Sequence, residues 1–149
     1  MTRRLWYPLA IFALATALLP GSAAAVSSDT TDAVHRVGPE KAEILHLLNS
    51  NSVEKQQRAV RLIGMYAHTG QREADFFNLL VAPLHGLVLN GETEALRIMA
   101  ISALSSIGSD AAMQGLRIQA ENIASARVQR IAKDALAAHE AQRIAAKKQ

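Results

Sequence analysis

Histidine is the residue type in this sequence best suited to hold a metal, because the chain has five histidines and no cysteine. Two imidazoles on one helix can share a metal when they stand three or four positions apart, and no two of these histidines do. Glu43 and His46 have the Glu-x-x-His spacing of di-iron bundles, but such sites need this motif twice with further carboxylates. The sequence therefore predicts neither a metal nor another cofactor.

Serine is the remaining candidate nucleophile, since a chain without cysteine cannot use thiol catalysis. Ser102, Ser105 and Ser106 lie in a segment with helical periodicity, and no Gly-x-Ser-x-Gly turn occurs. Glu92 and Glu94 stand where a helix is expected to begin, and negative charge there interacts favourably with the helix dipole. We therefore expect a protein that is not an enzyme.

The first 25 residues have the three parts of a secretory signal peptide. Arg3 and Arg4 supply positive charge, residues 9–19 are uncharged, and Pro20-Gly21 precede the small residues 22–25. Cleavage is expected after Ala25, with Ala24 as the next choice, and an uncleaved membrane anchor is the alternative. The segment predicts export by the general secretory route to the periplasm or the medium.

Removal of this segment changes the composition. The net charge of +3 falls to +1 when Arg3 and Arg4 are lost, and the single tryptophan, Trp6, is lost as well. About 120 residues remain, enough for one domain with one core. A nearly neutral exported chain without interleaved aromatic residues is not expected to bind nucleic acid.

Helical periodicity dominates the rest of the chain, and no segment alternates as a strand does. Residues 26–37 are polar and predict a flexible lead-in, whereas 38–140 predict an all-α domain and 141–149 a basic tail. Asn51 and Glu54 are spaced as a capping box, and Pro83 is expected to kink or divide its helix. The helices are expected at 39–48, 53–67, 73–89, 94–107, 109–121 and from 125 past 139.

One apolar pattern occurs three times. The copy in the 94–107 segment recurs 32 residues later and, less completely, 41 residues earlier. In the first alignment, Leu96, Met99, Ala100, Ala103 and Leu104 match Val128, Ile131, Ala132, Ala135 and Leu136. In the second, Ala100, Ala103, Leu104 and Ile107 match the earlier residues Ala59, Leu62, Ile63 and Tyr66. His139 takes the position of Ile107 in the last copy, which predicts a partly buried histidine.

The middle copy resembles a HEAT repeat of the short bacterial type. Its pattern is Leu96-Arg97, then Ala100, Ala103-Leu104 and Ile107-Gly108, followed by Ser109-Asp110 and a second amphipathic helix. The resemblance covers residues 52–138 and implies antiparallel helix pairs stacked as a short solenoid of about three repeats. Gln129 replaces the expected arginine in the last copy, and Lys55 replaces an apolar residue in the first. The alternative is a plain helical bundle.

Charge is distributed unevenly along the chain. Residues 26–96 carry six basic and nine acidic residues, a net of −3, and residues 97–149 carry eight and four, a net of +4. The last helix and tail hold most of the positive charge, at Arg127, Arg130, Lys133, Arg143, Lys147 and Lys148. These cations could meet an acidic partner or an anionic membrane surface.

The sequence therefore predicts a non-enzymatic interaction module or scaffold of the cell envelope. Solenoids resembling HEAT repeats generally bind proteins, so the expected partner is another envelope or secreted protein. Its contacts are expected at polar residues on the second helix of a pair, namely Gln114, Arg117 and Gln119, with the basic residues named above. The alternative is a membrane-surface or polyanion binder acting through the basic C-terminal helix and tail. Either interpretation is compatible with a monomer or a small homo-oligomer.

Overall fold

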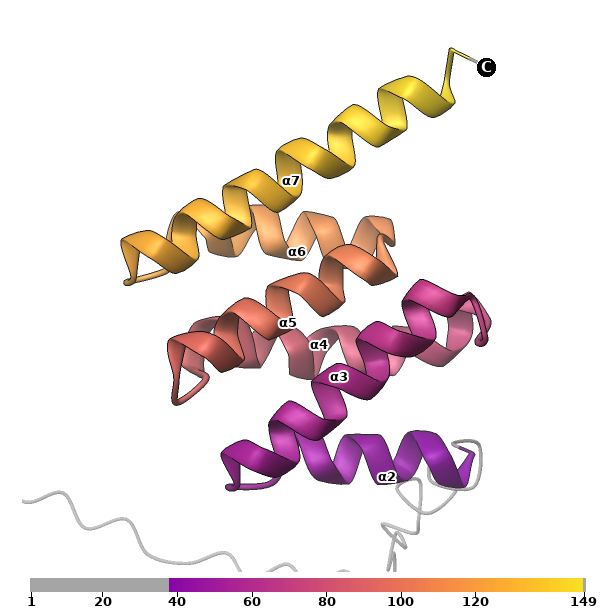
Figure 1. Cartoon of the computed structure of the whole chain (residues 1–149), viewed down its shortest axis with the longest axis vertical. Helices are drawn as coiled ribbons and strands as arrows, with labels where there is room; N and C mark the ends of the chain where they lie inside the picture. The colour runs from indigo at the N-terminus through magenta and orange to yellow at the C-terminus, as the bar shows by residue number, and fades with distance from the viewer. Residues whose placement is uncertain (1–37, 149) are drawn as a thin grey trace, which may run out of the picture.

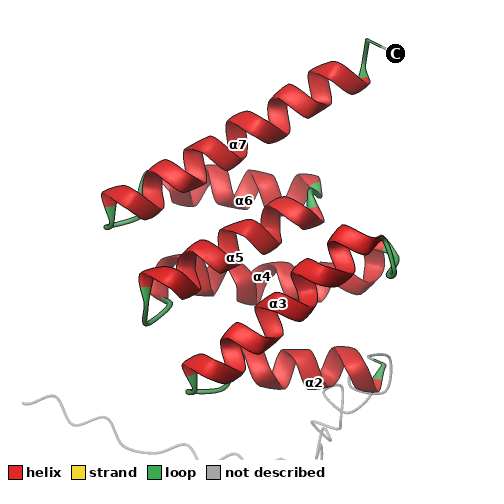
Figure 2. Ribbon diagram, viewed as in Figure 1, coloured by secondary structure: helices red, strands yellow, loops and turns green. Residues whose placement is uncertain are grey.

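The computed structural model describes residues 38–148, which form helices joined by short turns and contain no strand (Figure 2). The prediction of an all-helical chain is confirmed for this part. The signal peptide and the lead-in at 1–37 lie outside the described residues. The six helices are α2 (Pro39–Leu48), α3 (Val53–Thr69), α4 (Ala74–Asn90), α5 (Glu94–Ile107), α6 (Asp110–Ala120) and α7 (Ala126–Ala146).

The helices lie in two layers (Figure 1). Helices α3, α5 and α7 form the layer nearer the viewer, called here the front layer, and α2, α4 and α6 form the back layer. Each helix contacts the next one of its own layer, and α5 also contacts α4 and α6 in the back layer. The three copies of the apolar pattern are therefore on the three helices of the front layer.

Local signals define most helix ends. Ser52, Thr93, Ser109 and Ser125 each accept a hydrogen bond from a backbone N–H in the first turn. Gly70 and Gly108 end α3 and α5 with φ of 63° and 60°, a conformation that favours glycine. The predicted capping box at Asn51 and Glu54 is wrong by one position. Ser52 is the cap, and its hydroxyl also donates to Glu54.

Pro83 does not divide α4, which is helical from Ala74 to Asn90. A proline inside a helix leaves the carbonyl four residues earlier without its usual donor. That carbonyl belongs to Leu79, a residue 51% exposed, so water can satisfy it. The opposite side of α4 is held by buried apolar residues, namely Phe77, Leu80, Val81, Leu84, Leu87 and Val88. Packing along this side offsets the local cost of the proline.

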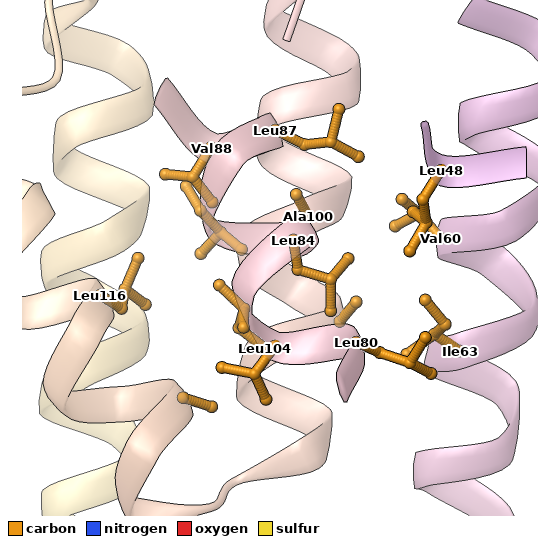
Figure 3. Packing of buried hydrophobic residues seen from close by; sticks show 14 of the residues in the cluster. Leu48, Val60, Ile63, Leu80, Leu84, Leu87, Val88, Ala100, Leu104 and Leu116 are labelled. Atoms are coloured by element: carbon orange, nitrogen blue, oxygen red, sulfur yellow. The ribbon is translucent and has the colours of Figure 1, made fainter. Parts of the chain in front are cut away.

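The core lies between the two layers (Figure 3). Its largest fully buried side chains include Ile63, Leu80, Leu84 and Leu104. Buried alanines, namely Ala59, Ala100, Ala103 and Ala132, let the front-layer helices approach closely. No polar or charged residue of the described chain is classed as buried, so packing of apolar side chains is the main source of stability.

In each front-layer helix, a side chain of the first turns donates a hydrogen bond to a backbone carbonyl at the end of the preceding helix or just after it. Gln56 donates to the Ser50 carbonyl at 2.8 Å, Arg97 to the Gly91 carbonyl at 2.8 Å, and Gln129 to the Ala120 carbonyl at 3.0 Å. Gln56 and Arg97 are 41 residues apart, and Arg97 and Gln129 are 32 apart. These are the same intervals at which the apolar pattern recurs. Each bond links the start of a front-layer helix to the end of the back-layer helix before it. Gln129 therefore makes the same kind of bond as Arg97, although its side chain is neutral.

The last helix, expected to run from 125 past 139, ends at Ala146. α7 therefore continues across the expected boundary between a domain at 38–140 and a tail at 141–149. α6 is only 11 residues long and α7 is 21. The second half of α7 consequently extends past the stack, as Figure 1 shows.

Candidate interaction site

An open cleft of about 360 Å³ lies between α6 and the second half of α7. Its lining residues are Asp110, Met113, Gln114 and Arg117 from α6, and His139 and Arg143 from α7. Asp110, Gln114 and Arg117 face the same way because they are spaced by four and three positions on one helix, and His139 and Arg143 are four apart on the other. The cleft thus brings polar side chains from two consecutive helices together.

Positive charge predominates in this cleft. Arg117 and Arg143 supply two guanidinium groups beside the imidazole of His139, against the single carboxylate of Asp110. Arg143 is within 3.7 Å of Glu140, whereas Arg117 has no ion pair among the described residues. Guanidinium groups bind carboxylates through two parallel hydrogen bonds. The cleft is therefore suited to an acidic side chain or a chain terminus.

His139 lies beside the turn between α5 and α6. A β-carbon placed on Gly108 would lie 3.9 Å from Cε1 of His139, so the imidazole packs beside that turn. The residue is half-buried, as its repeat position predicted. Sequence reasoning did not place His139, Asp110 or Met113 at a binding site. The four-residue spacing of His139 and Arg143 was the only local sign.

The nine predicted interaction residues do not form one surface. Gln114, Arg117 and Arg143 meet in the cleft, whereas Lys133 pairs with Glu121 at 3.2 Å. Three other groups lie elsewhere: Arg127 and Arg130 are exposed on the first turns of α7, Lys147 and Lys148 follow its end, and Gln119 faces α4. Arg130 and Arg143 are thirteen positions apart, about 20 Å along a helix. The basic residues of α7 are thus split between its two ends.

Gln119 has a partner within the fold. Its side-chain oxygen is 3.0 Å from Nδ1 of His85 on α4. The other ring nitrogen of His85, Nε2, is buried against Gly115 of α6 and has no partner among the described residues. A β-carbon on Gly115 would lie 2.4 Å from this nitrogen, so the glycine leaves room for the imidazole. His85, Gly115 and Gln119 together join α4 to α6.

A second polar cluster joins α2, α3 and the start of α4. Glu40 pairs with Arg72 and accepts a hydrogen bond from the Tyr66 hydroxyl, which raises the pKa of Tyr66 because the bond requires the protonated phenol. Arg72 also lies over the rings of Tyr66 and Phe76, at 5.0 and 5.6 Å from their centroids. Lys41 donates to the Asp75 carbonyl at 3.0 Å. These contacts use the polar groups internally, and we interpret the cluster as structural.

A smaller groove of about 160 Å³ runs between α3 and α5. Its lining is formed by Val60, Arg61, Gly64, Met99, Ser102 and Ala103. Arg61 is the only charged residue in that lining, and its guanidinium group donates to Gln57 on the same helix. The groove therefore offers less for recognition of a charged ligand than the cleft between α6 and α7.

Comparison of the chain with family models, with curated proteins and with solved structures found no match in any of the three. Within residues 38–148, no helix combines the length and the apolar character needed to cross a bilayer. Nor does this part of the chain group three histidine or acidic side chains as metal ligands. The described surface includes a charged cleft between α6 and α7 and an apolar side of α4.

Proposed function

We propose that this protein is a non-enzymatic interaction module exported to the cell envelope, built as a short HEAT-like solenoid of three helix pairs. Three features support the solenoid: the two layers, the apolar pattern shared by α3, α5 and α7, and the hydrogen bonds from Gln56, Arg97 and Gln129 to a carbonyl at or just after the end of the preceding helix. Export depends on the signal sequence at residues 1–25, which precedes the described part of the chain.

The proposed partner is another envelope or secreted protein that presents an acidic segment. The observation that carries this proposal is the convergence of Arg117, His139 and Arg143 on one open cleft. Arginine pairs well with carboxylates because its planar group donates two hydrogen bonds in parallel. Met113 also lines the cleft, but it is only 4% exposed, so the polar side chains supply most of the surface that a partner would meet.

A double charge reversal tests this proposal. A photoreactive crosslinking residue at Gln114 is expected to trap the partner in the native envelope, and Arg117→Glu with Arg143→Glu should reduce the trapped product at least about tenfold. The matched control is Arg127→Glu with Arg130→Glu, which changes the net charge equally but lies outside the cleft. Equal loss with both double variants, or no product with the unmodified cleft, would count against an acidic partner held here.

A second candidate function is binding to an anionic membrane surface. It is favoured by the exposed end of α7, where Ile144 is 48% exposed between Arg143 and Lys147. An apolar side chain flanked by cations is typical of segments that lie on anionic lipid. The cleft, by contrast, combines charge with shape, and for that reason we favour a protein partner.

Liposome flotation separates the two functions. A membrane-binding protein should float with vesicles that contain anionic lipid, lose this binding when residues 141–149 are deleted, and lose it as salt is raised. An interaction module that uses the cleft should stay with the soluble fraction under all these conditions. Flotation that persists after the deletion would exclude the α7 end as the membrane contact.

A further inference from the structure

The outward side of α4 is largely apolar, with an asparagine near each end. Helix α4 packs on α5 in the front layer and lies between α2 and α6 in the back layer, so one side of it remains open. No aspartate, glutamate, lysine or arginine occurs between Asp75 and Glu92. Leu79 and Leu89 are 51% and 38% exposed. The exposed residues of this surface, called here the α4 face, are Asn78, Leu79, Ala82, Gly86, Leu89 and Asn90.

The α4 face is symmetric about position 84. Leu79 and Leu89 are each five residues from that position, Ala82 and Gly86 are each two, and Asn78 and Asn90 are each six. Two antiparallel copies of α4 that cross at this position would set each residue against its counterpart of matching type. An interface across a two-fold axis requires this self-complementarity, because the same surface of both copies takes part. If one residue of the first copy contacts a second residue on the other copy, the same pair also meets with the two copies exchanged.

Gly86 lies on this face in the interior of α4. A β-carbon at Gly86 would meet nothing within 4 Å, and positive φ among the described glycines is confined to Gly70 and Gly108. Glycine in a helix interior is unfavourable relative to alanine. No described residue fills the space left by the absent side chain of Gly86, whereas a second helix that crosses closely over this position would fill it.

We propose that the protein forms a two-fold homodimer through the α4 face, with α4 antiparallel to α4 of the second copy. Leu79 then packs against Leu89 of the second copy, and Ala82 against Gly86 of the second copy, at the closest approach of the backbones. Asn78 and Asn90 meet at the two ends. The Asn78 amide nitrogen donates to Asp75 of its own chain at 3.1 Å, so its oxygen is the group that would accept from Asn90 of the second copy. This proposal does not depend on the function proposed for the cleft.

Engineered disulfides test the orientation directly, because the chain has no cysteine of its own. When Leu79→Cys chains are mixed with Leu89→Cys chains under mild oxidation, we expect a disulfide between unlike chains. Each variant alone should crosslink much less, because identical positions would lie ten residues apart, about 15 Å along the axis. If instead each variant crosslinked with itself and not with the other, the two helices would be parallel. Ile144→Cys chains are the control, and crosslinking of the α4 variants no stronger than this control would reject the contact.

A charge at the crossing point tests the dimer without disturbing the monomer. Gly86→Glu places its β-carbon in open space and improves helix propensity, so the chain should fold. We expect sedimentation to give a dimer mass for the unmodified protein and a monomer mass for Gly86→Glu, while Ile144→Glu, at an exposed site on α7, stays dimeric. An unmodified protein that is monomeric at all concentrations contradicts the proposal. If the unmodified protein floated with vesicles and Gly86→Glu abolished this flotation, the α4 face would be a membrane contact. That result would also contradict the proposed dimer.

Discussion

Leu104→Ala is expected to lower the free energy of unfolding by about 3–5 kcal/mol and the Tm by roughly 15 °C or more. Leu104 is fully buried on α5, the helix that contacts α3, α4, α6 and α7 (Figure 3). Its removal therefore leaves a cavity in the middle of the core, where the surrounding helices are held from several sides and cannot close it. Chemical denaturation followed by circular dichroism measures the loss.

Ile118→Ala is the control for this cavity. Ile118 is 67% exposed on α6, so its truncation removes little packing and should change the free energy of unfolding by less than about 0.5 kcal/mol. If the two variants were equally destabilised, the core would not lie between the two layers as described. A change confined to Leu104→Ala supports a single core centred on α5.

Gly115→Ala is expected to cost about 1–3 kcal/mol, although alanine is the better helix former. The new methyl group would lie 2.4 Å from Nε2 and 2.7 Å from Cε1 of His85. The imidazole would have to move, and its contact with Gln119 would be broken. Thermal unfolding should show a lower Tm, and Gly64→Ala provides the control because a β-carbon there meets nothing within 4 Å.

A double-mutant cycle identifies His85 as the cause. In a His85→Ala chain the imidazole is gone, so Gly115→Ala should no longer destabilise and should gain up to about 1 kcal/mol from its helix propensity. The coupling energy between the two sites is the change in unfolding free energy caused by Gly115→Ala in the unmodified chain minus the change it causes in the His85→Ala chain. Equal destabilisation by Gly115→Ala in both backgrounds would show that the backbone of α4, not the histidine, restricts this position.

Several helix ends could be predicted because their signals are local. Ser109 and Ser125 cap the residues that follow them, and Gly70 and Gly108 adopt the left-handed conformation that stops α3 and α5. Of the two outcomes expected at Pro83, a kink or a division of the helix, the division does not occur, and the reason is not local. The local cost of the proline is small beside the apolar side of α4 that packs into the core, and that packing is not visible in the neighbouring residues.

The candidate site was only partly predictable. Sequence reasoning selected polar residues on α6 and basic residues on α7, but it could not tell which of them meet. Arg143 reaches the cleft, whereas Arg130, on the same helix, lies about 20 Å away. Gln119 resembled Gln114 as a surface residue until the position of α4 gave it His85 as a partner.

The helical character of residues 38–148, the start of most helices and the apolar pattern on three of them follow from the sequence alone. The reason is that helix caps, glycines and hydrophobic periodicity depend on residues close to one another in the chain. The tertiary structure decided the rest. The cleft depends on how α7 extends past α6, and the α4 face depends on which side of α4 its neighbours leave uncovered. Both are set by packing between helices distant in sequence, for which no local pattern of residues provides a signal.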